Sequence, residues 1–325
     1  MGIRDRAVNS DKPTRWKADI AQSVDMYNEW FMAFAPEAFR ATRIQTAADV
    51  EATLRLTGNM TDIRPTIMQQ HPEILPTLRM STCPPLAVDR LIGLAGVSSH
   101  IVKSMELRKR LPLRMNPVDI EEALARIGRI IQAMVDPDIF VWIGRAQPPT
   151  DVEIHRAATI IADRLCGSVA NPIIRNAQER RQLATIKAWL EARGYSQSAS
   201  GDSREFDALP PGTFAFHKNV SVMLAGGVRR VTIPIDVVVM PKKARYQDLP
   251  LLLEAKSAGD FTNTNKRRKE EAMKMALLRA NYGESVQFNL FLCGYFDSGY
   301  LGYEAAEGID WVWEHRIDDL ALFGL

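Results

Sequence analysis

Two apolar, strand-like runs in the second half of the chain carry charged residues where a buried strand seldom tolerates them. The first run, 231–240, contains Asp236, and the second, 250–256, contains Glu254 and Lys256. Strands that bury both faces keep such residues only when the charges are paired or needed. The pattern therefore predicts a β-sheet with a polar site on two neighbouring strands.

The alternation of side chains along a strand predicts which residues share a face. Successive side chains point to opposite faces. One face of the first strand is therefore expected to be apolar: Val231, Ile233, Ile235, Val237 and Val239. Asp236 falls on the other face. In the second strand, Leu251, Leu253 and Ala255 share one face, and Leu252, Glu254 and Lys256 share the other. If the strands pair, Asp236 meets Glu254 and Lys256.

Two carboxylates and a lysine in this arrangement suit the hydrolysis of phosphodiesters. Asp236 and Glu254 offer hard oxygen ligands to Mg²⁺, which one or two carboxylates usually hold. A bound metal lowers the pKa of a water and offsets the charge of the scissile phosphate. Lys256 would orient that water or help to deprotonate it. The alternative is that all three are ordinary solvent-facing residues at a strand end and a sheet edge.

The distribution of charge fits a polyanionic substrate. The net charge of the chain is only +2. Lys and Arg nevertheless outnumber Asp and Glu in residues 166–281, whereas residues 282–325 are strongly acidic. A basic block around the candidate site favours nucleic acid as the ligand.

A predicted helix over 265–281 offers candidate contacts to DNA. Four consecutive cations would occupy its first turn: Lys266, Arg267, Arg268 and Lys269. That placement opposes the helix dipole, and a phosphate backbone would offset it. Asn263 and Asn265 could contact bases or cap the helix. The alternative is a solvated helix start that pairs locally with Glu270 and Glu271.

A second predicted helix begins at Asn171-Pro172 and ends at Ala192. Arg175 and Gln178 are candidate DNA contacts, and Glu179 is either a further carboxylate for the metal or a plain surface residue. The five histidines show no paired metal-ligand spacing, and they are interpreted as structural or surface residues: His71, His100, His155, His217 and His315.

The order of elements indicates an α/β fold with a mixed β-sheet flanked by helices and a mostly helical N-terminal region. Strands are expected at about 213–225, 228–240, 250–256, 286–293 and 308–314, and a polar loop at 196–204. Three parts are predicted: a flexible arm at 1–14, a helical region at 15–165 for DNA recognition or dimerisation, and a catalytic domain at 166–325.

The cysteines and the hydropathy bear on the environment of the protein. Cys83, Cys166 and Cys293 are scattered and are expected to be buried free thiols. No run approaches 18 apolar residues, and the N-terminus lacks an apolar core of a signal peptide. We therefore expect a cytoplasmic protein without a membrane partner.

Asp236 and Glu254-Ala255-Lys256 resemble the PD-(D/E)xK nuclease signature. In that fold a mixed sheet carries the motif between two helices, as in the predicted order here. Ile235 separates Pro234 from Asp236, where the signature has the two adjacent. The resemblance implies that Asp236, Glu254 and the Ala255 carbonyl bind one or two Mg²⁺ ions and that Lys256 positions the water.

Nearly the whole chain also resembles the XamI family of type II restriction endonucleases. The segments that carry this resemblance are Ser23–Phe31, Cys83–Leu91, Arg175–Glu179 and Phe261–Glu271. It implies cleavage of unmodified duplex DNA at a short palindrome such as GTCGAC, leaving 5′-phosphate and 3′-hydroxyl ends. It also implies a homodimer and a cognate DNA methyltransferase as the functional partner in the host.

Two other functions stay open at this point. One is a repair or recombination nuclease of the same superfamily that cuts by DNA structure. The other is a DNA-binding regulator without catalysis, which would leave the carboxylate-lysine cluster unexplained.

Overall fold

The computed structural model describes residues 7–199, 205–224, 229–262 and 264–325, apart from the side chains of residues 168–170 and 264–267. Its α-helices are α1 (Pro13–Leu56), α2 (Pro65–Gln70), α3 (Leu75–Met80), α4 (Val88–Ala95), α5 (Ser99–Arg108), α6 (Pro117–Met134), α7 (Asp151–Ala192), α8 (Thr264–Tyr282) and α9 (Ser298–Ala306). Its strands are β1 (Ser196–Gln197), β2 (Thr213–Met223), β3 (Arg230–Val239), β4 (Leu251–Ala258), β5 (Gln287–Gly294) and β6 (Asp310–Trp313). Short 3₁₀ segments are η2 (Pro72–Ile74), η3 (Phe206–Ala208) and η4 (Glu314–Phe323).

The chain divides into two compact units. One comprises Met1–Phe34 with Arg175–Leu325 and holds the sheet, and the other is Ala35–Ile174 and is helical. The sequence predicts a boundary near residue 165, whereas these units divide between Ile174 and Arg175, within α7. The first turns of α1 also belong to the sheet-bearing unit. Trp16 and Ile20 pack into the core of that unit, and the Ser23 hydroxyl accepts a hydrogen bond from the Gly294 amide at 2.8 Å.

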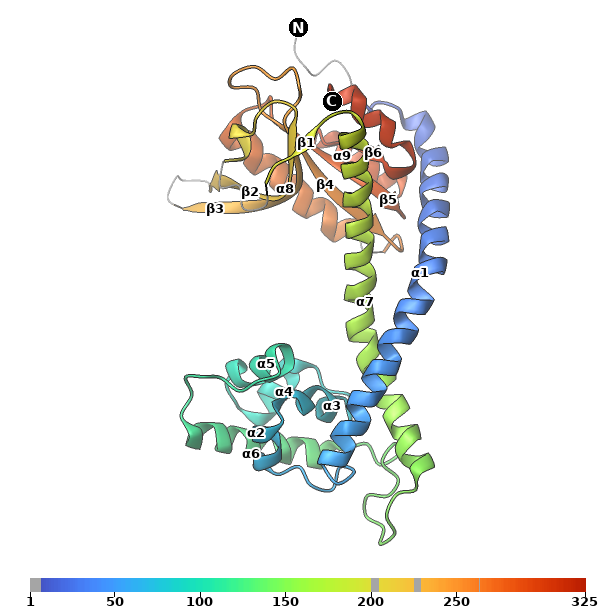
Figure 1. Ribbon diagram of the computed structural model, residues 1–325, viewed down its shortest axis with the longest axis vertical. Helices are drawn as coiled ribbons and strands as arrows, with labels where there is room; N and C mark the ends of the chain where they lie inside the picture. The colour runs from blue at the N-terminus through green and yellow to red at the C-terminus, as the bar shows by residue number, and fades with distance from the viewer. Residues whose placement is uncertain (1–6, 200–204, 225–228, 263) are drawn as a thin grey trace. The chain divides into compact units, whose positions relative to one another are not determined.

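A six-stranded mixed sheet forms the centre of the first unit, in the order β1-β2-β3-β4-β5-β6 (Figure 1). The pairs β2–β3 and β3–β4 are antiparallel, and the pairs β1–β2, β4–β5 and β5–β6 are parallel. Strands β2 to β6 lie where the sequence predicts strands. Helix α9 was not expected, and β1 falls within the segment predicted as a loop.

Helices cover both faces of the sheet. Side chains of α8 and α9 pack with the start of α1 on one face, around Leu252, Leu290 and Trp311. Side chains of α7 and η4 pack on the other face, around Val237, Leu253 and Phe291. Burial of both faces explains why these strands read as continuous apolar runs.

Residues 7–14, predicted as part of a flexible arm, are packed against the sheet. Val8 is fully buried, and its amide donates to the Asp310 carboxylate. The Asn9 side chain donates to the Trp311 carbonyl at 2.8 Å, and the Asn9 amide donates to Asp310 at 3.0 Å. These hydrogen bonds tie the start of the chain to β6, a long-range contact that local composition does not reveal.

Helix α7 runs without a break through the point where the sequence predicts a new helix. Pro172 lies inside this 42-residue helix. A proline there removes one helical hydrogen bond but does not force the helix to end. The helix crosses from the helical unit to the sheet-bearing unit at Ile174–Arg175.

The helical unit has its own apolar core, built from α1 to α7. Arg79 and Glu106, which are almost buried, form an ion pair at 2.8 Å. Cys166 is buried as predicted, and so is Cys293 in the other unit, whereas Cys83 is exposed between α3 and α4. Within the described part of the chain, none of the helices has the length and apolar character needed to cross a bilayer.

Candidate active site

The alternation of side chains breaks at the same place in β2 and β3. Ile233 and Ile235 pack on the α8 face of the sheet, whereas Val237 and Val239 pack on the α7 face. The expectation of one apolar face from Val231 to Val239 is therefore wrong. The odd-numbered side chains of β3 move from one face of the sheet to the other between Ile235 and Val237, and Asp236 lies at this irregularity.

The alternation of side chains in β2 is broken at the position opposite Asp236, because Phe214 packs on the α7 face and Val220 on the α8 face. Its pairs Phe216–Val237 and Lys218–Ile235 place His217 across from Asp236. His217 has a φ of 50°, which is uncommon for a residue other than glycine. The twisted backbone exposes His217 and leaves Asp236 half-buried.

Asp236 contacts the second strand through the backbone of Ala255. Pairing of β3 with β4 ends at Val237–Leu253, and the Asp236 carboxylate accepts a hydrogen bond from the Ala255 amide at 2.8 Å. Burial and the negative charge of Glu254 raise the pKa of Asp236 to about 6. The hydrogen bond from the Ala255 amide and the charge of Lys256 act in the opposite direction and lower this pKa. A strand residue directs its N–H and C=O toward the same neighbour, so the Ala255 carbonyl also faces β3.

Glu254 is held between two lysines. Its side chain is 7% exposed and lies on the α8 face with Leu252, as alternation in β4 predicts. One carboxylate oxygen lies 2.9 Å from the Lys256 ammonium and 2.6 Å from that of Lys274. The other oxygen is buried without a hydrogen-bond partner among the described residues. An unpaired buried carboxylate oxygen is costly, and a cation would satisfy it.

Lys256 also contacts the carboxylate of Glu271, which the sequence indicates only as part of a helix start. Its ammonium lies 3.4 Å from Glu271, which also accepts a hydrogen bond from the Tyr300 hydroxyl at 3.1 Å. Burial alone would lower the pKa of Lys256, but Glu254 and Glu271 outweigh it and raise the pKa. Lys256 is therefore held as a cation. Glu271 and Lys274 stand three residues apart in α8, a spacing that puts both on the same helix face.

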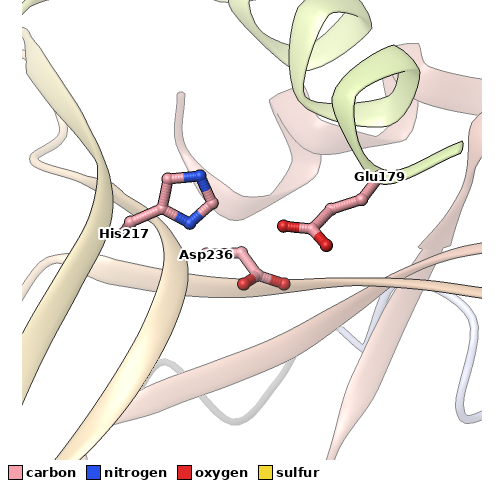
Figure 2. Close-up of side chains that lie close together, drawn as sticks. All are labelled: Glu179, His217 and Asp236. Carbon is pink, nitrogen blue, oxygen red and sulfur yellow. The ribbon is translucent and has the colours of Figure 1, made fainter. Parts of the chain in front are cut away.

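Helix α7 brings Glu179 to the site from the other face of the sheet. Gln182, one turn further on, donates to the carbonyls of Lys256 and Phe291, both at 3.3 Å. One ligand atom each from Glu179, His217 and Asp236 lies within 4.8 Å of the others, and Figure 2 shows the three side chains converging. His217 is exposed, in agreement with its interpretation as a surface residue. Its place beside Glu179 and Asp236 was not predicted, because the histidine lies nineteen residues before Asp236 and shows no ligand spacing.

The candidate DNA contacts differ in how exposed their side chains are. Asn263 lies outside the described residues, as do the side chains of Asn265, Lys266 and Arg267 in the first turn of α8. Lys269 and Arg175 are exposed. Arg268 is half-buried with its guanidinium 4.7 Å from the ring centre of Tyr303, and Gln178 is buried. A buried amide such as that of Gln178 is not placed to contact DNA.

The donor set fits a divalent cation. Carboxylates from β4 and α7, Glu254 and Glu179, lie near Asp236, and their like charges add to burial in raising the pKa of Asp236. A bound cation would offset that repulsion. The two lysines at Glu254 would remain to attract a phosphate.

Comparison with known proteins settles the class. The model of the XamI restriction endonuclease family matches residues 58–313. The chain belongs to the XamI restriction endonuclease family. It is also 50% identical over 317 residues to the type II restriction enzyme SalI of Streptomyces albus G, covering 98% of this chain and 99% of that relative. No solved structure matches the chain.

Family and relative together identify the protein as a sequence-specific type II restriction endonuclease, a site-specific deoxyribonuclease of a restriction-modification system. The expectation of a restriction endonuclease is confirmed. A repair nuclease and a regulator without catalysis are both set aside, since neither matches this family.

Proposed function

We propose that this endonuclease cleaves unmodified duplex DNA in a Mg²⁺-dependent reaction, with the sheet-bearing unit as a PD-(D/E)xK nuclease domain. The convergence of Asp236, Glu254 and Lys256 on β3 and β4 carries the proposal. Asp236, Glu254 and the Ala255 carbonyl would hold the metal, with Glu179 as a further carboxylate. When bound, Mg²⁺ would offset the charge of the scissile phosphate and lower the pKa of a water.

The protein's own groups then position the reactants. Lys256 would hold the attacking water and attract the phosphate, because Glu254 and Glu271 keep its ammonium charged. Lys274 would share the charge of Glu254 and keep that carboxylate aimed at the metal. Hydrolysis would leave 5′-phosphate and 3′-hydroxyl ends.

The remaining residues would bind and read DNA. We propose that the start of α8, with Asn263, Asn265 and the cations at 266–269, contacts the DNA together with Arg175. The helical unit Ala35–Ile174 would contribute recognition or dimerisation. The resemblance noted for the sequence supports a palindromic site such as GTCGAC, which two copies related by a two-fold axis would read. A host methyltransferase would protect the cell's own DNA in the cytoplasm.

Cleavage of unmethylated phage-length DNA tests this proposal. Wild-type protein in Mg²⁺ is expected to give discrete fragments whose ends map to GTCGAC, and EDTA is expected to leave the DNA intact. Asp236→Ala and Lys256→Ala should bind the mapped duplex but cut it at least about a thousandfold more slowly, equivalent to roughly 4 kcal/mol of barrier.

The exposed cation Lys269 provides a contrast for these variants. Lys269→Ala should weaken DNA binding and reduce its salt dependence while the chemical step at saturating DNA persists. Retained cleavage by Asp236→Ala or Lys256→Ala would refute the assignment of the active site. Fragments that map to another sequence would refute the GTCGAC proposal alone.

A further inference from the structure

His217 is an exposed imidazole held in the active-site region by an unfavourable backbone conformation. Its φ of 50° lies in the left-handed region, which glycine or asparagine adopts more readily. An exposed side chain gains little from packing, so burial does not account for a histidine here. Its ligand atom points toward Glu179 and Asp236 (Figure 2).

These three side chains come from three different elements. Glu179 lies on α7, His217 on β2 and Asp236 on β3. Gln182 ties α7 to β4 and β5, while the register of β2 and β3 sets His217 opposite Asp236. Convergence is therefore fixed by the fold and not by neighbouring positions in the sequence.

The separations suit one metal ion. The three ligand atoms lie within 4.8 Å of one another. Metal bonds to nitrogen and oxygen of about 2.1 Å place the ligands of one ion about 3–4 Å apart. Small side-chain rotations would bring the three atoms to those distances.

We infer that Glu179, His217 and Asp236 form a second metal position that shares Asp236 with the position at Glu254 and Ala255. The inference rests on the proposed function for the shared ligand Asp236 and assigns His217 as a nitrogen ligand. The first position offers oxygen ligands only, which favours Mg²⁺. The second offers an imidazole, which raises the affinity for later first-row ions such as Co²⁺.

The two metal positions would lie on either side of the Asp236 carboxylate. Asp236 is the natural bridge, because its carboxylate accepts a hydrogen bond from the Ala255 amide of β4 at 2.8 Å and also lies within 4.8 Å of the Glu179 and His217 ligand atoms. Metal pairs that share a carboxylate can act on both sides of a phosphate. His217 thereby becomes a residue that sets which divalent ions the second position accepts.

Calorimetric titration of the full-length protein with Co²⁺ and, separately, with Mg²⁺ tests the assignment without relying on activity. His217→Asn removes the imidazole at a φ that asparagine tolerates, and His217→Gly relieves the backbone as well. Both should raise the Kd for Co²⁺ by about 10- to 100-fold or more, since loss of even an outer-shell partner costs that much. The Kd for Mg²⁺ should change less than about twofold, because Mg²⁺ depends on oxygen ligands.

Pulsed EPR of the Mn²⁺-loaded protein gives a direct readout of the ligand. The wild type should show coupling to an imidazole nitrogen, and both His217 variants should lose it. His100→Asn is the matched control, because His100 is an exposed histidine of the helical unit, and it should keep the nitrogen coupling.

The outcomes separate this inference from the proposed function. Unchanged Co²⁺ affinity and unchanged nitrogen coupling in His217→Asn and His217→Gly would overturn the second position. A wild-type protein that binds no Co²⁺ would also overturn it. Wild-type affinity for Mg²⁺ and Co²⁺ in Asp236→Asn would instead refute the proposed active-site metal, on which both positions depend.

Discussion

Glu304 is a fully buried carboxyl group on α9, and its removal should change how stability depends on pH. Burial raises its pKa from the usual 4.5 to about 8, and Glu271 adds to the effect. The folded protein therefore holds a neutral Glu304 at pH 7, where the unfolded chain ionises it. The perturbation we consider is Glu304→Gln, which keeps the shape and removes the titration.

The sign and the size of the effect of Glu304 on the free energy of unfolding follow from the linkage between proton binding and folding. A group whose pKa is raised on folding contributes stability that is full below the unfolded value and is lost as pH rises toward the folded value. At about 1.4 kcal/mol for each pKa unit, Glu304 costs roughly 3 kcal/mol at pH 7 and about 5 kcal/mol above pH 8. Glu304→Gln should differ from the wild type by only about 1 kcal/mol at pH 5 and exceed it increasingly as pH rises.

Urea unfolding followed by tryptophan fluorescence measures this difference from pH 5 to pH 8.5. Trp311 and Trp313 are buried in the same unit and report its unfolding. Other titrating groups cancel in the comparison of wild type with Glu304→Gln, while Glu304→Asp keeps a carboxyl group and should keep the pH dependence. A difference that stays constant across this pH range would refute the reasoning.

Two further variants test the site and the helical unit. Glu271→Gln should lower kcat about tenfold, equivalent to about 1.4 kcal/mol of barrier, because Lys256 loses one carboxylate partner, while KM for DNA stays unchanged. Glu270→Gln, which changes an exposed neighbour, should leave kcat unchanged. Arg79→Met should lower the free energy of unfolding, measured by urea denaturation, by about 3–5 kcal/mol, because Glu106 is left almost buried without its partner. The double variant Arg79→Met/Glu106→Leu should regain most of that stability.

Local patterns in the sequence were enough to predict five of the six described strands and the charged residues of β4. Continuous apolar runs predict strands that are buried on both faces, and β2 to β6 lie where these runs occur. Strict alternation in β4 places Glu254 and Lys256 on one face. Such features depend only on neighbours along the chain, and the period of two survives folding wherever the strand is regular.

Longer-range contacts decided the rest of the site. The sequence gives no sign that β2 and β3 change faces together at His217 and Asp236, because the change requires the two strands to twist as a pair. Glu271 and Lys274 acquire roles only when α8 packs on the face that carries Glu254. The same holds for residues 7–14, which are ordered by Asp310 some 300 positions away.

The sequence by itself determined the family, the strand order along the chain and the residue types available for phosphodiester chemistry, because identity and periodicity are properties of the chain. The tertiary structure alone decided which of those residues meet. Helix α7 places Glu179 beside Asp236, and the twisted pair of strands turns His217 toward both. Contacts between distant segments are set by packing of whole helices on the sheet, which spacing along one sequence does not encode.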